Sequence, residues 1–99
     1  MVQRMSLALS EAGELVIDHG IAKGPVTVTA SFDEYNLDAE VSYEGSSLPL
    51  PDKRPSEDEI LSDPSAVIRL GGYLIRSHAD TTSSVASGSQ AVLKIHMEH

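Results

Sequence analysis

The chain alternates apolar and polar side chains in two neighbouring segments, Val26-Thr27-Val28-Thr29-Ala30-Ser31-Phe32 and Leu37-Asp38-Ala39-Glu40-Val41-Ser42-Tyr43-Glu44. An alternation of period two is typical of strands, because successive side chains point to opposite faces of a sheet. The turn-forming residues Asp33-Glu34-Tyr35-Asn36 separate the two segments. We therefore predict an antiparallel hairpin with one half-buried apolar face and one polar face toward solvent.

The segment before the hairpin has the periodicity of a helix. From Met5 to Val16 the apolar residues recur about every 3.6 positions, and Gly20 is a plausible end of the helix. Gly13 lies inside this segment, where glycine costs about 1 kcal/mol relative to alanine, so we expect a close backbone contact there. Gly24-Pro25 then separates the helix from the first strand.

The segment after the hairpin begins with an irregular loop and continues with two helix starts. We expect Leu48 and Leu50 to attach the loop, residues 45–56, to the rest of the protein. Ser56 and Glu59 have the spacing of a capping box, which predicts a short helix through Leu61. Asp63-Pro64 predicts a second helix that continues to about His78.

Two further strands are predicted at the C-terminal end. Residues 81–86 are polar and β-branched, residues 87–89 form a turn, and residues 91–97 alternate apolar and polar. Together with the hairpin, these segments predict an α+β fold in which a four-stranded, largely antiparallel (mixed) sheet has two to three helices on one face. We expect a two-layer sandwich that forms a single domain over residues 1–99.

Composition excludes several functions. The chain has 99 residues, with 7 Lys and Arg against 15 Asp and Glu, a net charge of −8 and no cysteine. We therefore expect no nucleic-acid partner and no polybasic contact with lipid, and disulfides and thiolate chemistry are excluded. No apolar run approaches the roughly 20 residues of a membrane helix, so we expect no direct membrane insertion.

The acidic residues are concentrated in residues 33–63, which hold ten of them against Lys53 and Arg54. This excess is typical of a solvated surface, but it could also repel phosphate or bind a basic partner. The four histidines, His19, His78, His96 and His99, lack the spacing of a helical metal site, and we predict neither a metal nor a cofactor.

Three strings in order resemble the histidine-kinase-like ATPase family, which has the Bergerat fold. The first is the helix Leu7–Gly20, in which Glu11 and His19 match the outer positions of the family's first motif and Leu15 replaces its asparagine. The second is Tyr43-Glu44-Gly45, where Tyr43 replaces aspartate. The third is Arg69-Leu70-Gly71-Gly72-Tyr73-Leu74-Ile75-Arg76-Ser77-His78-Ala79-Asp80, where Arg69 replaces the first glycine.

The resemblance implies that the asparagine would ligate magnesium and the aspartate would bind the adenine amino group. Leu15 has no oxygen for a hard cation, and Tyr43 is bulky where a small carboxylate is expected. We therefore expect a degenerate domain that is not an enzyme and has no catalytic residue. Its vestigial cleft would comprise Glu11, Leu15, Tyr43, Gly45, Arg69, Gly71 and Tyr73.

A narrower resemblance concerns the cytoplasmic C-terminal domain of bacterial xanthine/uracil permeases. It rests on residues 31–38, 43–45, 50–56 and 94–99. It implies a regulatory or interaction module excised from a nucleobase transporter, at the cytoplasmic face of the bacterial inner membrane. Its partner would be the transporter domain of the same polypeptide, and a homo-oligomer is also open.

Two other functions stay open at this point. One is an active serine kinase similar to the anti-sigma-factor kinases, in which Glu11, Arg69 and Gly71 would carry ATP binding and catalysis. The other is a sensor that binds a nucleobase or another small ligand in the vacated cleft, with Tyr43 or Tyr73 available for stacking.

Overall fold

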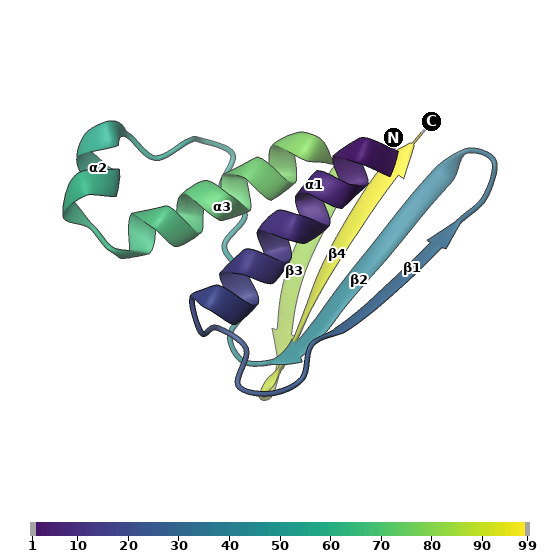
Figure 1. Cartoon of the computed structure of the whole chain (residues 1–99), viewed down its shortest axis with the longest axis horizontal. Helices are drawn as coiled ribbons and strands as arrows, with labels where there is room; N and C mark the ends of the chain where they lie inside the picture. The colour runs from purple at the N-terminus through teal and green to yellow at the C-terminus, as the bar shows by residue number, and fades with distance from the viewer. Residues whose placement is uncertain (1, 99) are drawn as a thin grey trace.

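The two alternating segments form the predicted hairpin in the computed structural model, which describes residues 2–98 (Figure 1). Strand β1 (Thr27–Phe32) pairs antiparallel with β2 (Asn36–Glu44), from Thr27 opposite Ser42 to Phe32 opposite Leu37. The carboxylate of Asp33 closes the turn, because it accepts hydrogen bonds of 2.8 Å from the backbone N–H groups of Tyr35 and Asn36. These bonds hold the pKa of Asp33 below its ordinary value.

The sheet also contains β3 (Thr81–Ser87) and β4 (Gln90–Glu98), and its order is β1-β2-β4-β3. Every neighbouring pair is antiparallel. Helices α1 (Val2–Gly13) and α3 (Ser65–His78) lie on one face, and the short α2 (Glu57–Ser62) projects at one end (Figure 1). This arrangement confirms the predicted α+β fold.

The core lies between the central strands and the two long helices. The helix-facing side chains of β2 and β4 are buried and contact apolar residues of α1 and α3 in one cluster. Its larger fully buried members are Leu15, Val16, Val41, Tyr43, Ile75, Leu93, Ile95 and Met97.

The expected burial of the first strand is confirmed only at Val26, which precedes β1 and packs against the core, and is wrong for β1 itself. All six residues of β1 are exposed, including Val28 and Phe32, which the alternation placed on a half-buried face. The apolar side chains of β1 do occupy the helix side of the sheet, since Val28 lies opposite Val41 and Phe32 opposite Leu37. Helix α1 covers the central strands and leaves the edge strand bare (Figure 1).

The helices start where their capping residues predict. The Ser56 hydroxyl accepts a hydrogen bond of 3.2 Å from the Glu59 N–H, and it also bonds the Glu59 carboxylate at 3.3 Å. Asp63 accepts hydrogen bonds from the N–H and the hydroxyl of Ser65 at 3.0 and 2.8 Å. These two caps start α2 and α3, and α3 ends at His78 as expected.

His99, one of the four histidines, lies outside the described residues. Within residues 2–98 no helix is long and apolar enough to cross a membrane.

The loop between β2 and α2 is attached to the body as expected. Leu48 is buried in the core, Leu50 packs against it, and the Arg76 guanidinium donates a 3.1 Å hydrogen bond to the Leu50 carbonyl. A Cβ at Gly72 would lie 1.8 Å from the Pro49 carbonyl oxygen. The loop backbone therefore rests directly on the backbone of α3.

The close contact expected at Gly13 is absent, because a Cβ there would meet nothing within 4 Å. Gly13 instead marks the point where α1 widens into the π-helical turn η1 (Glu14–Asp18). The tight glycine contacts of the helical layer occur at Gly71 and Gly72 of α3.

The surroundings of Gly72 and Gly13 predict opposite effects of an alanine substitution on stability. Gly72→Ala would force α3 and the loop apart, so we expect it to lower the free energy of unfolding by about 1–3 kcal/mol. The matched control, Gly13→Ala, has space and a helical backbone, and we expect it to be neutral or to stabilise by up to about 1 kcal/mol. Urea unfolding followed by circular dichroism measures both, and equal effects of the two variants would contradict the described packing.

Candidate functional site

Three of the predicted site residues meet between α1 and α3. A Cβ built at Gly71 would lie 2.7 Å from both methyl groups of Leu15 and 2.9 Å from the Glu11 carboxylate oxygen Oε1. Leu15 is only 1% exposed, and Gly71 is buried. The bare backbone of Gly71 therefore gives α1 the space to approach α3, and the Leu15 side chain fills that space.

The π-helical turn places Leu15 at this contact. Within η1 both Leu15 and its neighbour Val16 are buried. The chain then turns at Gly20, where φ is +69°, and the Ala22 N–H donates a 2.8 Å hydrogen bond to the Val16 carbonyl. A π-turn inside a helix is uncommon and often marks a functional position, but here its inward side chains are hydrocarbon.

Tyr43 and Gly45 lie at the end of β2 and also serve packing. Tyr43 is 2% exposed, and its hydroxyl donates a 2.7 Å hydrogen bond to the Ser46 carbonyl. Burial raises the pKa of the Tyr43 phenol, because the charged form would lose water. Gly45 has a φ of +152°, and a Cβ there would lie 2.2 Å from the Ile21 carbonyl oxygen. Both residues thus close the end of the core against the segment that follows η1.

Arg69 lies on α3 as Gly71 does, but it contacts acidic residues outside the contact of Gly71 with α1. The Arg69 guanidinium forms ion pairs with Glu59 at 3.2 Å and with Asp63 at 3.1 Å, which connect α3 to α2 and to the turn between them. Tyr73 is half-buried on α3. The structure therefore brings together Glu11, Leu15 and Gly71, places Tyr43 in the same core as Leu15, and pairs Arg69 with other residues.

Glu11 is the ionisable member of the contact between α1 and α3. Its half-buried position raises the pKa of its carboxyl through desolvation first and through the nearby Glu14 second, while His78 and His19 act in the opposite direction. The contact therefore holds the Glu11 carboxyl beside the hydrocarbon of Leu15, with Glu14, His19 and His78 close enough to act on its charge. Within residues 2–98 no group of three or more His, Asp or Glu residues is arranged to hold a metal ion.

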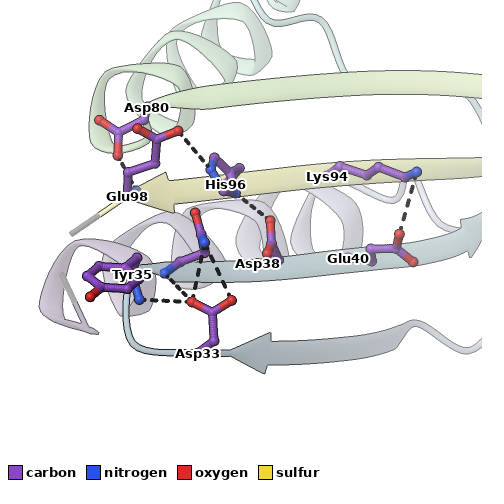
Figure 2. A network of polar contacts seen from close by, with 9 residues as sticks. Asp33, Tyr35, Asp38, Glu40, Asp80, Lys94, His96 and Glu98 are labelled. Atoms are coloured by element: carbon purple, nitrogen blue, oxygen red, sulfur yellow. Dashed lines mark hydrogen bonds and ion pairs between the residues drawn. The ribbon is translucent and has the colours of Figure 1, made fainter.

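A second polar region, which the sequence reasoning did not identify, lies on the helix-free face of the sheet (Figure 2). His96 bonds the Asp38 carboxylate through Nδ1 at 2.5 Å and the Glu98 carboxylate through Nε2 at 3.4 Å, and Lys94 pairs with Glu40 at 3.6 Å. The hydrogen bond that the protonated His96 ring donates to the Asp38 carboxylate is the main cause that raises the pKa of His96. A trough of about 460 Å³ on this face is lined by residues that include Asp38, Glu40, Lys94 and His96.

The register between β2 and β4 creates this region. Asp38 lies opposite His96, and Glu40 lies opposite Lys94. Opposite charges across neighbouring strands stabilise a sheet only modestly when the pairs are exposed, because water and salt screen them. The alternation of polar residues in both strands was visible in the sequence, but their pairing was not, because β2 and β4 are not consecutive.

The comparisons with known proteins support the fold and not a finer assignment. No family model matches the sequence, and no curated protein matches it. Among solved structures, the Acinetobacter baumannii histidine kinase AdeS superposes with a TM-score of 0.62 at 14% sequence identity, over 97% of this chain and 46% of that chain. The chain thus spans less than half the length of this structural relative, and the likeness shows that it has a histidine-kinase-like fold.

Because the pKa of Glu11 is raised, we predict that Glu11→Gln, its neutral analogue, stabilises the protein in a pH-dependent way. The folded state holds the Glu11 proton more tightly than the unfolded chain does, so the protonated carboxyl favours folding. This contribution to stability is fully present below the ordinary pKa of 4.5, and it is lost as the pH rises through the raised pKa of the folded state. At pH 7 the ionised carboxylate therefore opposes folding, and we expect Glu11→Gln to raise the melting temperature. This gain should disappear below the ordinary carboxyl pKa.

The control for this prediction is Glu34→Gln in the exposed turn between β1 and β2, which should change the melting temperature little at either pH. Thermal unfolding followed by circular dichroism provides the comparison. A melting temperature of Glu11→Gln that equals that of the parent protein at pH 7, or a gain of the same size in acid, would contradict the desolvation of Glu11.

Proposed function

We propose that this domain is a non-catalytic regulatory or interaction module that has a histidine-kinase-like fold and a closed nucleotide site. The observation that carries the proposal is the burial of Leu15 against Gly71. By resemblance, Leu15 stands where the ATPase family has its magnesium-binding asparagine. A buried hydrocarbon side chain offers no oxygen to magnesium, and its removal from the core would cost about 2–5 kcal/mol.

The second altered position supports the same proposal. By resemblance, Tyr43 stands where the ATPase family has the aspartate that binds the adenine amino group. The Tyr43 hydroxyl already donates a hydrogen bond to the Ser46 carbonyl. A nucleotide base could reach this position only if the Tyr43 ring left the core. Metal binding and base recognition would therefore both require the core to open.

Charge also disfavours a triphosphate. Residues 33–63 hold ten acidic residues against Lys53 and Arg54, and Arg69, the first residue of the third motif, is paired with Glu59 and Asp63. An excess of acidic residues lowers the local concentration of polyanions. The same excess would suit a basic partner.

The proposal extends to a tethered position at a nucleobase transporter. It is supported by the likeness of four short strings to the C-terminal domain of xanthine/uracil permeases, and these strings form the β1–β2 turn, the end of β2, the loop before α2 and the end of β4. In this proposal the domain lies at the cytoplasmic face of the bacterial inner membrane and contacts the transporter part of its own polypeptide. A reading frame that codes for this domain without upstream membrane helices would remove the transporter part of the proposal alone.

Calorimetric titration tests the closed site. We expect no binding heat when ATP and magnesium are added to about 1 mM, and no shift of the melting temperature, since ligand that binds only the folded state must raise it. Micromolar affinity for Mg–ATP would overturn the proposal and favour the kinase-like alternative, which a phosphate-transfer assay with labelled ATP would then test.

Titration with xanthine and uracil under the same conditions separates the remaining alternative, the small-ligand sensor. The proposal predicts no shift of the melting temperature with either base. Saturable binding that Tyr43→Phe weakens would contradict a closed site, since the variant removes only the hydroxyl that contacts Ser46.

A further inference from the structure

Strand β1 is an edge strand whose apolar side chains have no cover. Val28 is 55% exposed and Phe32 is 81% exposed, although their neighbours across the hairpin, Val41 and Leu37, are buried in the core. Val28, Ala30 and Phe32 therefore extend the apolar face of the sheet beyond the edge of α1 (Figure 1). We call these three residues the β1 ledge.

The backbone N–H and C=O groups of the β1 ledge point away from β2, toward the free edge of the sheet. The Asp33 N–H donates a 2.9 Å hydrogen bond to the Asn36 carbonyl, so Asp33 is turned toward β2. Because backbone groups along an antiparallel strand alternate in direction, Ser31, Thr29 and Thr27 also face β2. The N–H and C=O groups of the β1 ledge consequently face away from the sheet, where the strand order places no neighbour.

Nothing in the composition of β1 blocks pairing at this edge. Proteins protect edge strands with charged side chains, proline or bulges, but the six residues of β1, Thr-Val-Thr-Ala-Ser-Phe, include none of these. The opposite edge strand, β3, presents Thr82 and Ser84 on its helix side, and these are less apolar. Because β1 carries no charge, a second copy of this protein of net charge −8 meets little repulsion along the strand itself.

We propose that β1 pairs antiparallel with β1 of a second copy, about a two-fold axis at Ala30. Val28 then lies opposite Phe32 of the partner subunit, and the outward backbone groups of both ledges bond each other in the same alternation. The two sheets join into one continuous sheet, and the four bulky side chains of the two ledges shield each other from water. A two-fold axis is the usual symmetry of such a self-complementary contact.

The charges at the ends of β1 fit this orientation. The acidic residues Asp33 and Glu34 follow the strand, and Lys23 precedes it. An antiparallel arrangement brings the acidic turn of each copy toward the end of the other that holds Lys23 and Glu44, whose charges balance, whereas a parallel arrangement would place the two acidic turns together. The antiparallel dimer therefore avoids the repulsion between the acidic turns, independently of the function proposed above.

Self-association is measured first by sedimentation of the unmodified protein. The paired surface is small, so we expect a reversible dimer that appears as the concentration is raised to about 1 mM. Val28→Lys places a charge on the ledge and should weaken dimerisation at least tenfold. Thr29→Lys adds the same charge on the other face of the same exposed strand and should have a smaller effect.

Single-cysteine variants locate the contact, since the chain has no cysteine of its own. Opposite residues of a hydrogen-bonded antiparallel pair have Cα atoms about 5.5 Å apart, which suits a disulfide. We expect Ala30→Cys to form a covalent dimer faster than Ala86→Cys, its matched control at an exposed alanine of β3. A monomer at every concentration, or equal cross-linking of the two variants, would overturn the proposal.

Discussion

The contact of Leu15 with the bare backbone of Gly71 sets the distance between α1 and α3, and the rest of the helical layer depends on it. A side chain at Gly71 would push the two helices apart and open the core above β2 and β4. The adjacent Gly72 leaves space for the loop before α2, whose Pro49 carbonyl approaches the backbone of α3. Two consecutive glycines thus allow α3 to contact both α1 and the loop, and this close packing leaves Leu15 and Tyr43 almost without exposure.

The sequence predicted the elements that local chemistry controls. The Asp33 turn, the Ser56 and Asp63 caps and the alternation in β2 and β4 act within a few residues, so they are readable without knowledge of the fold. The exposure of β1 was predicted wrongly, because it depends on how far α1 extends over the sheet. The contacts of Gly13 and Gly71 could not be predicted from local sequence either, since tertiary packing decides which residue lies against a glycine.

The candidate site was predicted in part for the same reason. Of the residues that the resemblance grouped, Glu11, Leu15 and Gly71 are in contact, whereas Arg69 pairs with residues of α2 and of the turn that follows it. The paired charges of β2 and β4 were missed because the pairing of non-consecutive strands has no local signal. The fold is histidine-kinase-like, and Leu15 and Tyr43, which by resemblance alone stand at ligand-binding positions of the ATPase family, contribute side chains to the core.

The central claim is that Leu15 is a core residue and does not line an open cleft. The most direct measurement is the unfolding free energy of Leu15→Asn, which introduces the residue that the resembled ATPase family has at this position, with Leu61→Asn at an 85% exposed position as the control. A buried amide without a partner adds to the lost apolar packing, so the account predicts a loss of about 3 kcal/mol or more for Leu15→Asn. The control should change by less than about 1 kcal/mol. A Leu15→Asn protein as stable as the parent would contradict the account, because it would show that water reaches this position.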